Sequence, residues 1–309
     1  MKKISLSDTG LAVSNVVMGC MRLQELSKPE AEKLIRTAMD AGINFFDHAD
    51  VYGDGRCETL FAEATGMNDT LREKMVIQSK CGIRKTPFAH YDFSKEHILA
   101  AVDGILQRLR TGFLDVLLLH RPDALMEPEE IAAAFDALQA GGKVRHFGVS
   151  NQNPMQMELI QKYVPQKLVA NQLQLSIAHA PMIGSGMAVN MQLDQSVERT
   201  NSVLDYCRLH AVTVQAWSPF QKGFFEGPFL GDMQHYAELN AVIHRIAAKY
   251  NVPDTAVAVG WLTRHPANMQ VVLGTTKVRR MLDACKGSAL PLTREEWYGI
   301  YRAAGNIIP

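Results

Sequence analysis

Three side chains in the first half of the chain have the types and spacing to donate a proton to a carbonyl oxygen. Tyr52 lies in the segment FFDHADVYGDG, Lys80 ends MVIQSK, and His120 ends LDVLLLH. A free phenol has a pKa of roughly 10 and is a poor acid at neutral pH. A nearby lysine ammonium stabilises the phenolate, and a carboxylate such as Asp47 holds that lysine charged and aimed. His120 then serves as a second donor that orients the carbonyl oxygen.

Proton donation alone reduces nothing, because no side chain supplies a hydride and a cofactor must bring it. No GxGxxG motif follows a strand, so a Rossmann module is not indicated. Instead, LGTTKVRR leads into a predicted helix with hydroxyls and cations at its start, which is an anion site at a barrel's usual phosphate-binding location. The segment therefore predicts binding of a phosphorylated dinucleotide. Its residues are Gly274, Thr275, Thr276, Lys277, Arg279 and Arg280.

Short apolar runs that position these groups alternate with longer amphipathic runs to the end of the chain. Helical patterns of 3.6-residue period cover 28–42, 94–110, 128–142 and 240–251, among others. The strand-like runs are 16–19, 43–47, 75–80, 114–120, 144–150, 167–172, 212–218 and 269–274. Strands that are apolar on both faces and separated by helices must be parallel and covered on both sides. We therefore expect an α/β protein with a (β/α)₈ TIM barrel.

The barrel prediction gathers the polar groups at one end, because an active site lies at the carboxyl ends of the strands. ISLSDTGLAVS predicts a short N-terminal β-hairpin ahead of the first barrel strand, and 292–309 predicts an extra C-terminal helix. No linker-like segment divides the chain, so 1–309 is expected to be a single barrel domain. The long connections 173–195 and 219–235 are expected to be functional loops.

The composition narrows the class of partner. Lys and Arg number 32, as do Asp and Glu, which argues against a nucleic acid or an anionic membrane surface. Five widely spaced cysteines, with no CxxC pair, indicate neither a disulfide framework nor a zinc site. No signal peptide or run of 18 apolar residues is present, so we expect a cytoplasmic protein that acts on a small molecule. The oligomeric state is open, with a monomer as the expectation.

Each candidate taken alone also has a structural interpretation. Lys80 can be half of a buried ion pair, and His120 can be a structural histidine whose ring nitrogens are hydrogen-bonded within the core. Trp217 alone is more typical of core packing, and GTTK alone is typical of any helix start. The joint pattern favours chemistry, because each residue falls independently at the carboxyl end of a predicted strand.

A series of motifs in these segments resembles the aldo-keto reductase family, and within it the bacterial YdhF-like branch. FFDHADVYG is similar to the family's FDTA-x-x-YG, and the other motifs follow in the family's order from residue 4 to about 300. They are SK, LLLHRPD, GKVRHFGVSN, NQLQLS, AWSP and LGTTKVRR. The resemblance implies NADPH-dependent reduction of an aldehyde or ketone on a (β/α)₈ barrel, with NADP(H) as cofactor and no metal.

By motif position the resemblance also assigns roles. The catalytic residues would be Tyr52 as general acid, with Asp47, Lys80 and His120. Ser150, Asn151 and Gln172 would hold the nicotinamide carboxamide, and Trp217 would stack on its ring. The remaining cofactor contacts would be Gly19, Ser218, Gly274, Thr275, Thr276, Lys277, Arg280 and Asp283, with Ser218 along the pyrophosphate, Lys277 and Arg280 at the 2′-phosphate, and Asp283 near the adenine.

Two positions depart from the family pattern, and two other functions stay open. His48 replaces the usual Thr or Ser beside the acid, and Ala284 replaces an adenine-contacting Asn of some members. The ligand types of His48, Asp50 and His120 suggest a metal-dependent barrel hydrolase as one alternative, although no HxH pair occurs. The other alternative is a regulatory protein that binds NADPH without useful turnover.

Overall fold

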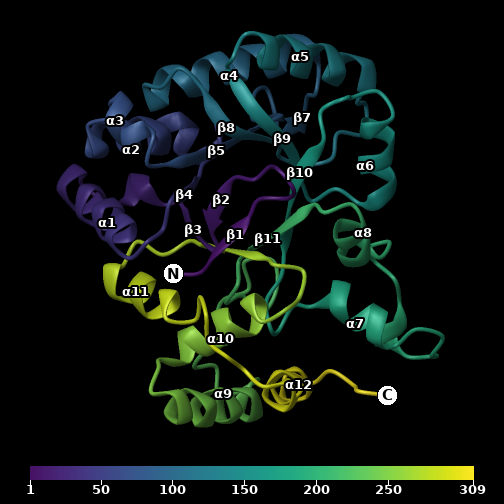
Figure 1. The fold of residues 1–309 in the computed structure, drawn as a ribbon. Coiled ribbons are helices and arrows are strands. Elements are labelled where there is room, and N and C mark those ends of the chain that lie inside the picture. The colour runs from purple at the N-terminus through teal and green to yellow at the C-terminus, as the bar shows by residue number, and fades with distance from the viewer.

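A computed structural model describes residues Met1–Pro309 and contains a closed barrel of eight strands (Figure 1). All neighbouring barrel strands are parallel, which confirms the predicted (β/α)₈ architecture. In barrel order the strands are β10 (Leu168–Gln174), β11 (Thr213–Trp217), β12 (Gln270–Leu273), β3 (Val16–Gly19), β4 (Phe45–Asp47), β5 (Val76–Cys81), β8 (Leu114–Leu119) and β9 (Val144–Ser150).

Helices surround the barrel and cover the outer faces of its strands (Figure 1). This packing explains why the strands are buried on both faces and read as mainly apolar runs. The helices are α1 (Lys28–Asp40), α2 (Arg56–Thr65), α3 (Asp69–Arg72), α4 (Lys95–Leu109), α5 (Pro128–Ala140), α6 (Pro154–Gln161), α7 (Pro181–Met187), α8 (Val203–Leu209), α9 (Ala237–Tyr250), α10 (Asp254–Thr263), α11 (Val278–Cys285) and α12 (Arg294–Ala303).

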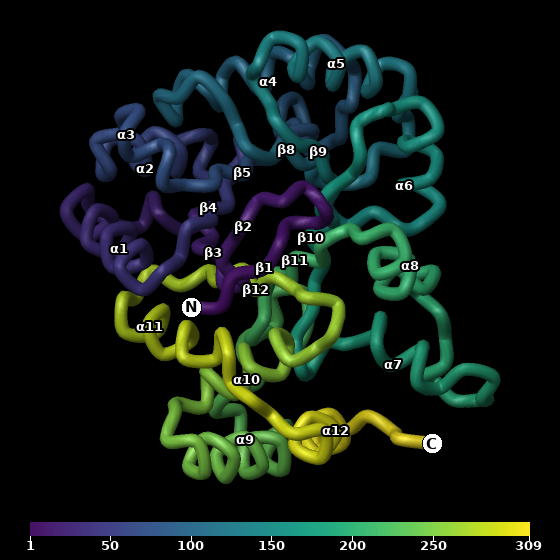
Figure 2. Tube along the Cα trace, viewed as in Figure 1, coloured from purple at the N-terminus to yellow at the C-terminus, as the bar shows by residue number.

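The predicted N-terminal hairpin is present and lies across the amino-terminal end of the barrel (Figure 2). Its strands β1 (Lys3–Ser5) and β2 (Ala12–Ser14) pair antiparallel. Apolar side chains of this segment, including Leu6 and Val13, join Val17 and Phe45 in a buried cluster that fills this end of the barrel. The hairpin is therefore a plug for the barrel floor.

Strand β4 begins two residues later than the sequence pattern predicts, and Asn44 explains the difference. Its side-chain oxygen accepts a hydrogen bond from the Ser14 backbone N–H at 2.7 Å, and its amide donates to the Ala12 carbonyl at 3.1 Å. Asn44 thus ties the hairpin to the barrel instead of extending the strand.

The long connections are partly ordered by short elements. The one after β10 contains α7 and a 3₁₀ turn at Asp194–Ser196, and the one after β11 contains an isolated bridge between Gln221 and Pro228. A small antiparallel pair, β6 (Ile83–Arg84) and β7 (His90–Tyr91), follows β5 and was not expected from the sequence.

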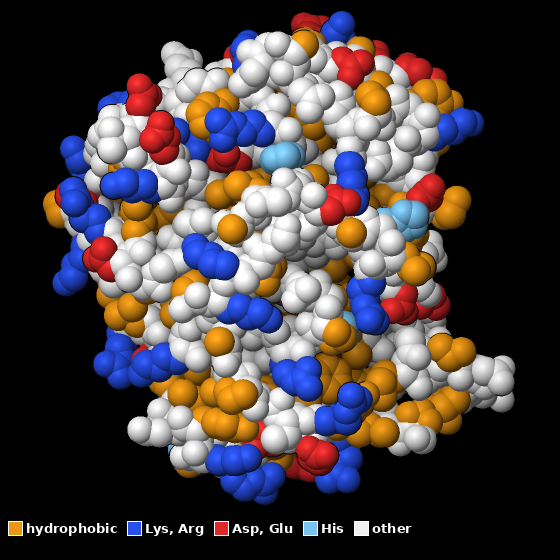
Figure 3. All heavy atoms as spheres, viewed as in Figure 1, with side chains coloured by type: hydrophobic (Ala, Val, Ile, Leu, Met, Phe, Trp, Pro, Cys, Tyr) orange, Lys and Arg blue, Asp and Glu red, His pale blue; other side chains and the backbone are white.

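The predicted C-terminal helix is α12, and two tryptophans fasten it to α10. The rings of Trp261 and Trp297 stack with centroids 4.8 Å apart, and each indole N–H donates to the other residue's carbonyl. On the face that carries the hairpin, acidic and basic side chains are interspersed (Figure 3). No helix combines the length and apolar composition that crossing a membrane requires.

Candidate active site at the carboxyl ends of the strands

The structure brings Asp47, Tyr52 and Lys80 together around one ammonium group. Lys80 Nζ donates to Asp47 Oδ1 at 2.7 Å, to the His48 carbonyl at 2.8 Å and to the Tyr52 hydroxyl oxygen at 3.1 Å. These contacts use all three ammonium protons. The Tyr52 oxygen accepts from Lys80, and its own O–H has no acceptor in the protein. The phenol proton is therefore free to face another molecule.

The local chain conformation aims Tyr52 at this point. The backbone N–H of Asp50 donates to the Lys80 carbonyl at 3.1 Å, which ties the segment after β4 to the end of β5. Tyr52 opens a 3₁₀ turn in which Gly53 and Gly55 have φ values of 57° and 85°. Such left-handed angles favour glycine, so the YGDG sequence fits the turn that presents the phenol.

Burial sets the protonation of both groups. Burial disfavours the Lys80 ammonium, but the Asp47 carboxylate and Tyr52 outweigh it, so the pKa of Lys80 lies above its ordinary value. Burial raises the pKa of the Tyr52 phenol, and the neighbouring Lys80 offsets that rise only in part. The expectation that Lys80 stabilises a phenolate is correct in sign, yet Tyr52 remains a neutral phenol at neutral pH. A neutral phenol is the proton-donating form.

His120 lies beside Tyr52, with the two rings edge to face and their centroids 5.9 Å apart. Burial, together with the positive charges of Lys80 and Arg121, holds the pKa of His120 well below its usual range. The imidazole is therefore neutral, and its Nδ1 has no hydrogen-bond partner. A neutral ring with uncommitted nitrogens can donate one hydrogen bond to an oxygen placed near Tyr52.

The residues expected around a nicotinamide converge next to this group. The indole N–H of Trp217 donates to Asn151 Oδ1 at 3.1 Å, and the Asn151 amide donates to Ser150 Oγ at 2.8 Å. The Ser150 hydroxyl donates to the Gln172 carbonyl at 3.0 Å. Asn151 has a φ of 59°, which turns the chain at the end of β9. The set is preorganised by its own hydrogen bonds.

Gln172 makes a contact that the sequence does not reveal. Its side-chain amide donates to Asp47 Oδ1 at 3.0 Å and to Gln215 Oε1 at 3.1 Å. Both of its protons are thereby committed to the barrel interior, and its Oε1 makes no hydrogen bond within the protein. Gln78, which sequence reasoning missed, also donates to Asp47 Oδ1, at 2.6 Å.

The segment after β12 presents free cations. Lys277 and Arg280 are exposed and make no ion pair, and the Thr275 hydroxyl accepts from the Lys277 backbone N–H at 3.1 Å. Helix α11 starts directly after Lys277. Asp283 instead pairs with Arg279 at 3.0 Å, so its carboxylate is engaged on the same helix. Thr276 is half-buried and Gly274 exposed in the same turn.

Gly19 and Ser218 lie at strand ends that border the mouth. A side chain on Gly19 would come within 2.7 Å of the Leu273 carbonyl oxygen, so the close approach of β12 by itself requires a glycine. Ser218 follows β11 with a φ of 53°. Arg121, another residue that the sequence reasoning did not single out, has its guanidinium 5.6 Å from the Trp217 ring centroid. It makes no ion pair.

His48 lies on the other side of the barrel wall from Asp47. Its ring is fully buried and lies edge to face against Phe61 of α2, with the ring centroids 4.6 Å apart. Neither ring nitrogen has a hydrogen-bond partner. Burial, helped by the charge of Lys80, lowers the pKa of His48 to about 3. Ala284 is buried in the core. His48 therefore does not join the proton-donating group.

The metal-hydrolase alternative requires several ligands that converge. The structure contains no group of three or more His, Cys, Asp or Glu side chains placed to hold an ion. The side chain of His48 points towards Phe61 and away from the mouth. The three residues that suggested this alternative thus do not form a ligand set.

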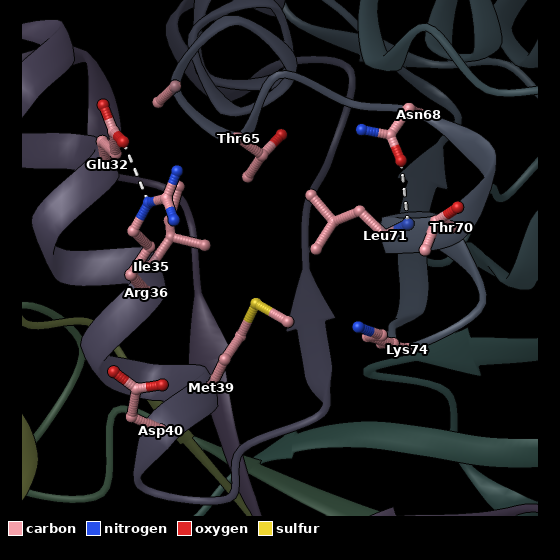
Figure 4. A pocket seen from close by; sticks show the side chains of 11 residues that line it. Glu32, Ile35, Arg36, Met39, Asp40, Thr65, Asn68, Thr70, Leu71 and Lys74 are labelled. Atoms are coloured by element: carbon pink, nitrogen blue, oxygen red, sulfur yellow. Dashed lines mark hydrogen bonds and ion pairs between the residues drawn. The ribbon is translucent and has the colours of Figure 1, made fainter.

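A groove on the outside of the barrel lies between α1 and the α2–α3 segment (Figure 4). Arg36 pairs with Glu32 at 2.9 Å on one wall, and Asn68 accepts from the Leu71 backbone N–H at 3.0 Å on the other. None of the predicted site residues lines this groove, so it is separate from the barrel mouth.

Comparison with known proteins gives a match over almost the whole chain. The model of the Aldo/keto reductase family matches residues 15–303. The chain is 36% identical to the uncharacterized oxidoreductase YcsN of Bacillus subtilis, with 98% of each chain covered. It is 33% identical to the oxidoreductase YdhF of Escherichia coli, with 98% of this chain and 97% of that one covered. These relatives confirm the resemblance to the bacterial branch.

A solved structure shows the same fold. An aldo-keto reductase from Klebsiella pneumoniae in complex with NADPH superposes with a TM-score of 0.77 at 22% identity, covering 100% of this chain and 97% of that chain.

Proposed function

This chain belongs to the aldo/keto reductase family, and on that premise we propose that it reduces an aldehyde or ketone with NADPH, using Tyr52 as the proton donor. The observation that carries the proposal is the hydrogen-bond arrangement at Tyr52. Its oxygen accepts from Lys80 while its own proton has no acceptor in the protein. A carbonyl oxygen in the mouth is the acceptor that this arrangement lacks.

Each catalytic side chain then has one task. Asp47 holds Lys80 charged, and the Lys80 ammonium stabilises the negative charge that appears on Tyr52 when its proton leaves. The neutral His120 donates a hydrogen bond to the same carbonyl oxygen and fixes its direction. Tyr52 passes its proton to the oxygen as negative charge develops there. The product is an alcohol.

The residues present fit a phosphorylated dinucleotide. Lys277 and Arg280 are exposed cations without partners beside a helix start, which suits an anion such as a 2′-phosphate. Gln172 Oε1 is uncommitted and can accept from a carboxamide, next to Ser150, Asn151 and Trp217. NADPH, when bound, supplies the hydride that no side chain can provide. In this proposal Thr275, Thr276, Gly274 and Ser218 lie along its phosphates, whereas Asp283 reaches the adenine only if it leaves Arg279.

The decisive experiment is Tyr52→Phe, measured by NADPH oxidation with an aromatic aldehyde. Loss of a general acid costs a factor of about 100 or more in kcat. Binding of NADPH, followed by fluorescence, should change little because no proposed cofactor contact is removed. Tyr163→Phe, at an exposed tyrosine after α6, is the matched control. Undiminished turnover in Tyr52→Phe contradicts the proposed proton donor.

A regulatory protein that only binds NADPH is distinguished by a single-turnover measurement. The intact group of Asp47, Lys80 and Tyr52 favours chemistry, because a sensor needs no aimed phenol. We expect bound NADPH to be oxidised once an aldehyde is mixed with the complex. Tight binding with no oxidation across aldehydes, ketones and quinones indicates the regulatory role instead.

A further inference from the structure

Four buried glutamines form a continuous hydrogen-bonded chain through the barrel interior. They come from four different strands, and all of their side chains are buried. We call this set the glutamine column. Its members, from the barrel floor to the mouth, are Gln270 of β12, Gln215 of β11, Gln78 of β5 and Gln172 of β10. Barrel interiors are ordinarily filled by branched apolar side chains, so a polar chain here needs an explanation.

The column begins at the barrel floor. The Gln270 amide donates to the Ser14 carbonyl of the hairpin at 2.9 Å, and its own oxygen accepts from Gln215 at 2.9 Å. Gln215 and Gln78 exchange two hydrogen bonds, at 2.8 Å and 3.0 Å. Gln215 Oε1 also accepts from Gln172 at 3.1 Å. Both amide protons of Gln215 are used in these contacts.

The column ends on the catalytic carboxylate. Gln78 and Gln172 each donate to Asp47 Oδ1, at 2.6 Å and 3.0 Å. The same oxygen accepts from Lys80 at 2.7 Å. Three donors thus converge on one carboxylate oxygen, and two of them come from the column. Asp47 and the Ser14 carbonyl can only accept hydrogen bonds, so they fix the orientation of every amide between them.

We propose that the glutamine column is a positioning device: it fixes Asp47 and thereby aims Lys80 at the Tyr52 hydroxyl. The inference rests on the proposed function, because Tyr52 is the group that is aimed. The amide N–H groups of Gln78 and Gln172 also neutralise part of the carboxylate charge, and they reach Asp47 from the barrel interior and so leave the substrate space at the mouth open. Every amide nitrogen and oxygen of the column except Gln172 Oε1 has a hydrogen-bond partner, and such a network holds its members in one arrangement, so the column specifies one geometry for the acid.

The proposal predicts how Tyr52 responds when Gln78 becomes leucine. Without the Gln78 donor, the Asp47 charge is less neutralised and draws Lys80 away from the phenol. Both changes disfavour the phenolate and raise the pKa of Tyr52. The charged or titratable groups that face this phenol are Lys80 of β5, Asp47 of β4, Cys20 after β3 and His120 after β8. None of these is altered by the substitution.

Three leucine variants test the column. For Gln78→Leu we expect kcat to fall about tenfold, the effect of losing one hydrogen bond to a charged group. Gln215→Leu removes the support of Gln78 and Gln172 without touching Asp47, so we expect a smaller fall of the same kind. If Gln78→Leu does not fold, Gln215→Leu alone tests the proposal. Gln270→Leu removes the link to the Ser14 carbonyl but lies furthest from Asp47, so its fall in kcat should be the smallest of the three.

A second readout needs neither cofactor nor substrate. Ultraviolet difference titration against the Tyr52→Phe protein isolates the ionisation of Tyr52, which should move to higher pH in Gln78→Leu and by a smaller amount in Gln270→Leu. If wild-type protein fails to oxidise NADPH, the proposed function is wrong, and this titration still decides the role of the column. Equal effects of Gln78→Leu and Gln270→Leu, or an unmoved titration in both Gln78→Leu and Gln215→Leu, overturn the proposal.

Discussion

His48 shows how a neighbouring residue in sequence can be remote from the chemistry. The sequence places it directly after Asp47, which suggests a second titratable group in the site. Successive residues of a strand point to opposite faces, so Asp47 faces the barrel interior and the His48 ring packs outside against Phe61. What His48 does provide is its backbone carbonyl, which accepts from Lys80. Any residue type could supply that carbonyl.

The buried His48 ring predicts a loss of stability in acid. Its folded-state pKa of about 3 lies below the ordinary value of 6.5, so the unfolded chain binds the proton more readily between these values. The contribution of the neutral ring is fully present above pH 6.5 and is lost as the pH falls towards 3. We therefore expect His48→Thr to unfold at a lower pH than wild type, measured by circular dichroism during acid titration.

The size of this effect is bounded by about 1.4 kcal/mol for each pKa unit of difference. His244→Gln is the control, because that side chain is largely exposed on α9 and pairs only with Asp254. An identical acid midpoint in wild type and His48→Thr would show that the ring gains no proton on unfolding. His265, whose pKa burial lowers to about 4, would retain part of the acid sensitivity in every variant.

At the scale of elements, the sequence pattern predicts every barrel strand to within about two residues, because each is apolar on both faces. The short elements are harder to predict from the sequence. The β6–β7 pair spans two residues on each strand, and α7 is rich in glycine, so neither has a detectable period. Gln78, Gln215 and Gln270 were equally hidden, because each occupies a strand position where one polar residue looks accidental until the barrel closes; Gln172 was expected only as a cofactor contact.

The close contact of β3 with β12 gives a prediction about packing. A Cβ on Gly19 would lie 2.7 Å from the Leu273 carbonyl oxygen and 3.1 Å from Val272 Cγ1. Because a strand carbonyl cannot move aside alone, Gly19→Ala should destabilise the protein by roughly 1–3 kcal/mol. Urea denaturation gives the change in free energy of unfolding.

Gly299→Ala provides the comparison for this experiment. Gly299 lies within α12, and a Cβ there meets nothing within 4 Å. Alanine should be neutral there or stabilise the helix by about 0.5–1 kcal/mol. Gly19→Ala is expected to lose stability while Gly299→Ala does not, and a Gly19→Ala protein as stable as wild type would mean that β3 and β12 can separate freely.

At the scale of the whole molecule, the barrel divides its tasks between its two ends. The proton-donating group, the glutamine contacts to Asp47 and the free cations after β12 lie at the carboxyl ends of the strands. The hairpin and the cluster around Leu6 close the amino ends (Figure 2). In barrels of this class the first end carries function and the second carries stability. The glutamine column is the polar link between the two ends.

This division predicts that the plug can be weakened without loss of chemistry. Leu6 is fully buried in the floor cluster, so Leu6→Ala should cost about 2–5 kcal/mol in urea denaturation through lost contacts and a cavity. Leu209→Ala, at a leucine that is 83% exposed, should cost little. Below its unfolding transition, Leu6→Ala should keep the wild-type kcat, because the column is held by the Ser14 carbonyl and not by Leu6. A fall in kcat that parallels the loss of stability would instead mean that floor packing and Asp47 positioning are one coupled structure.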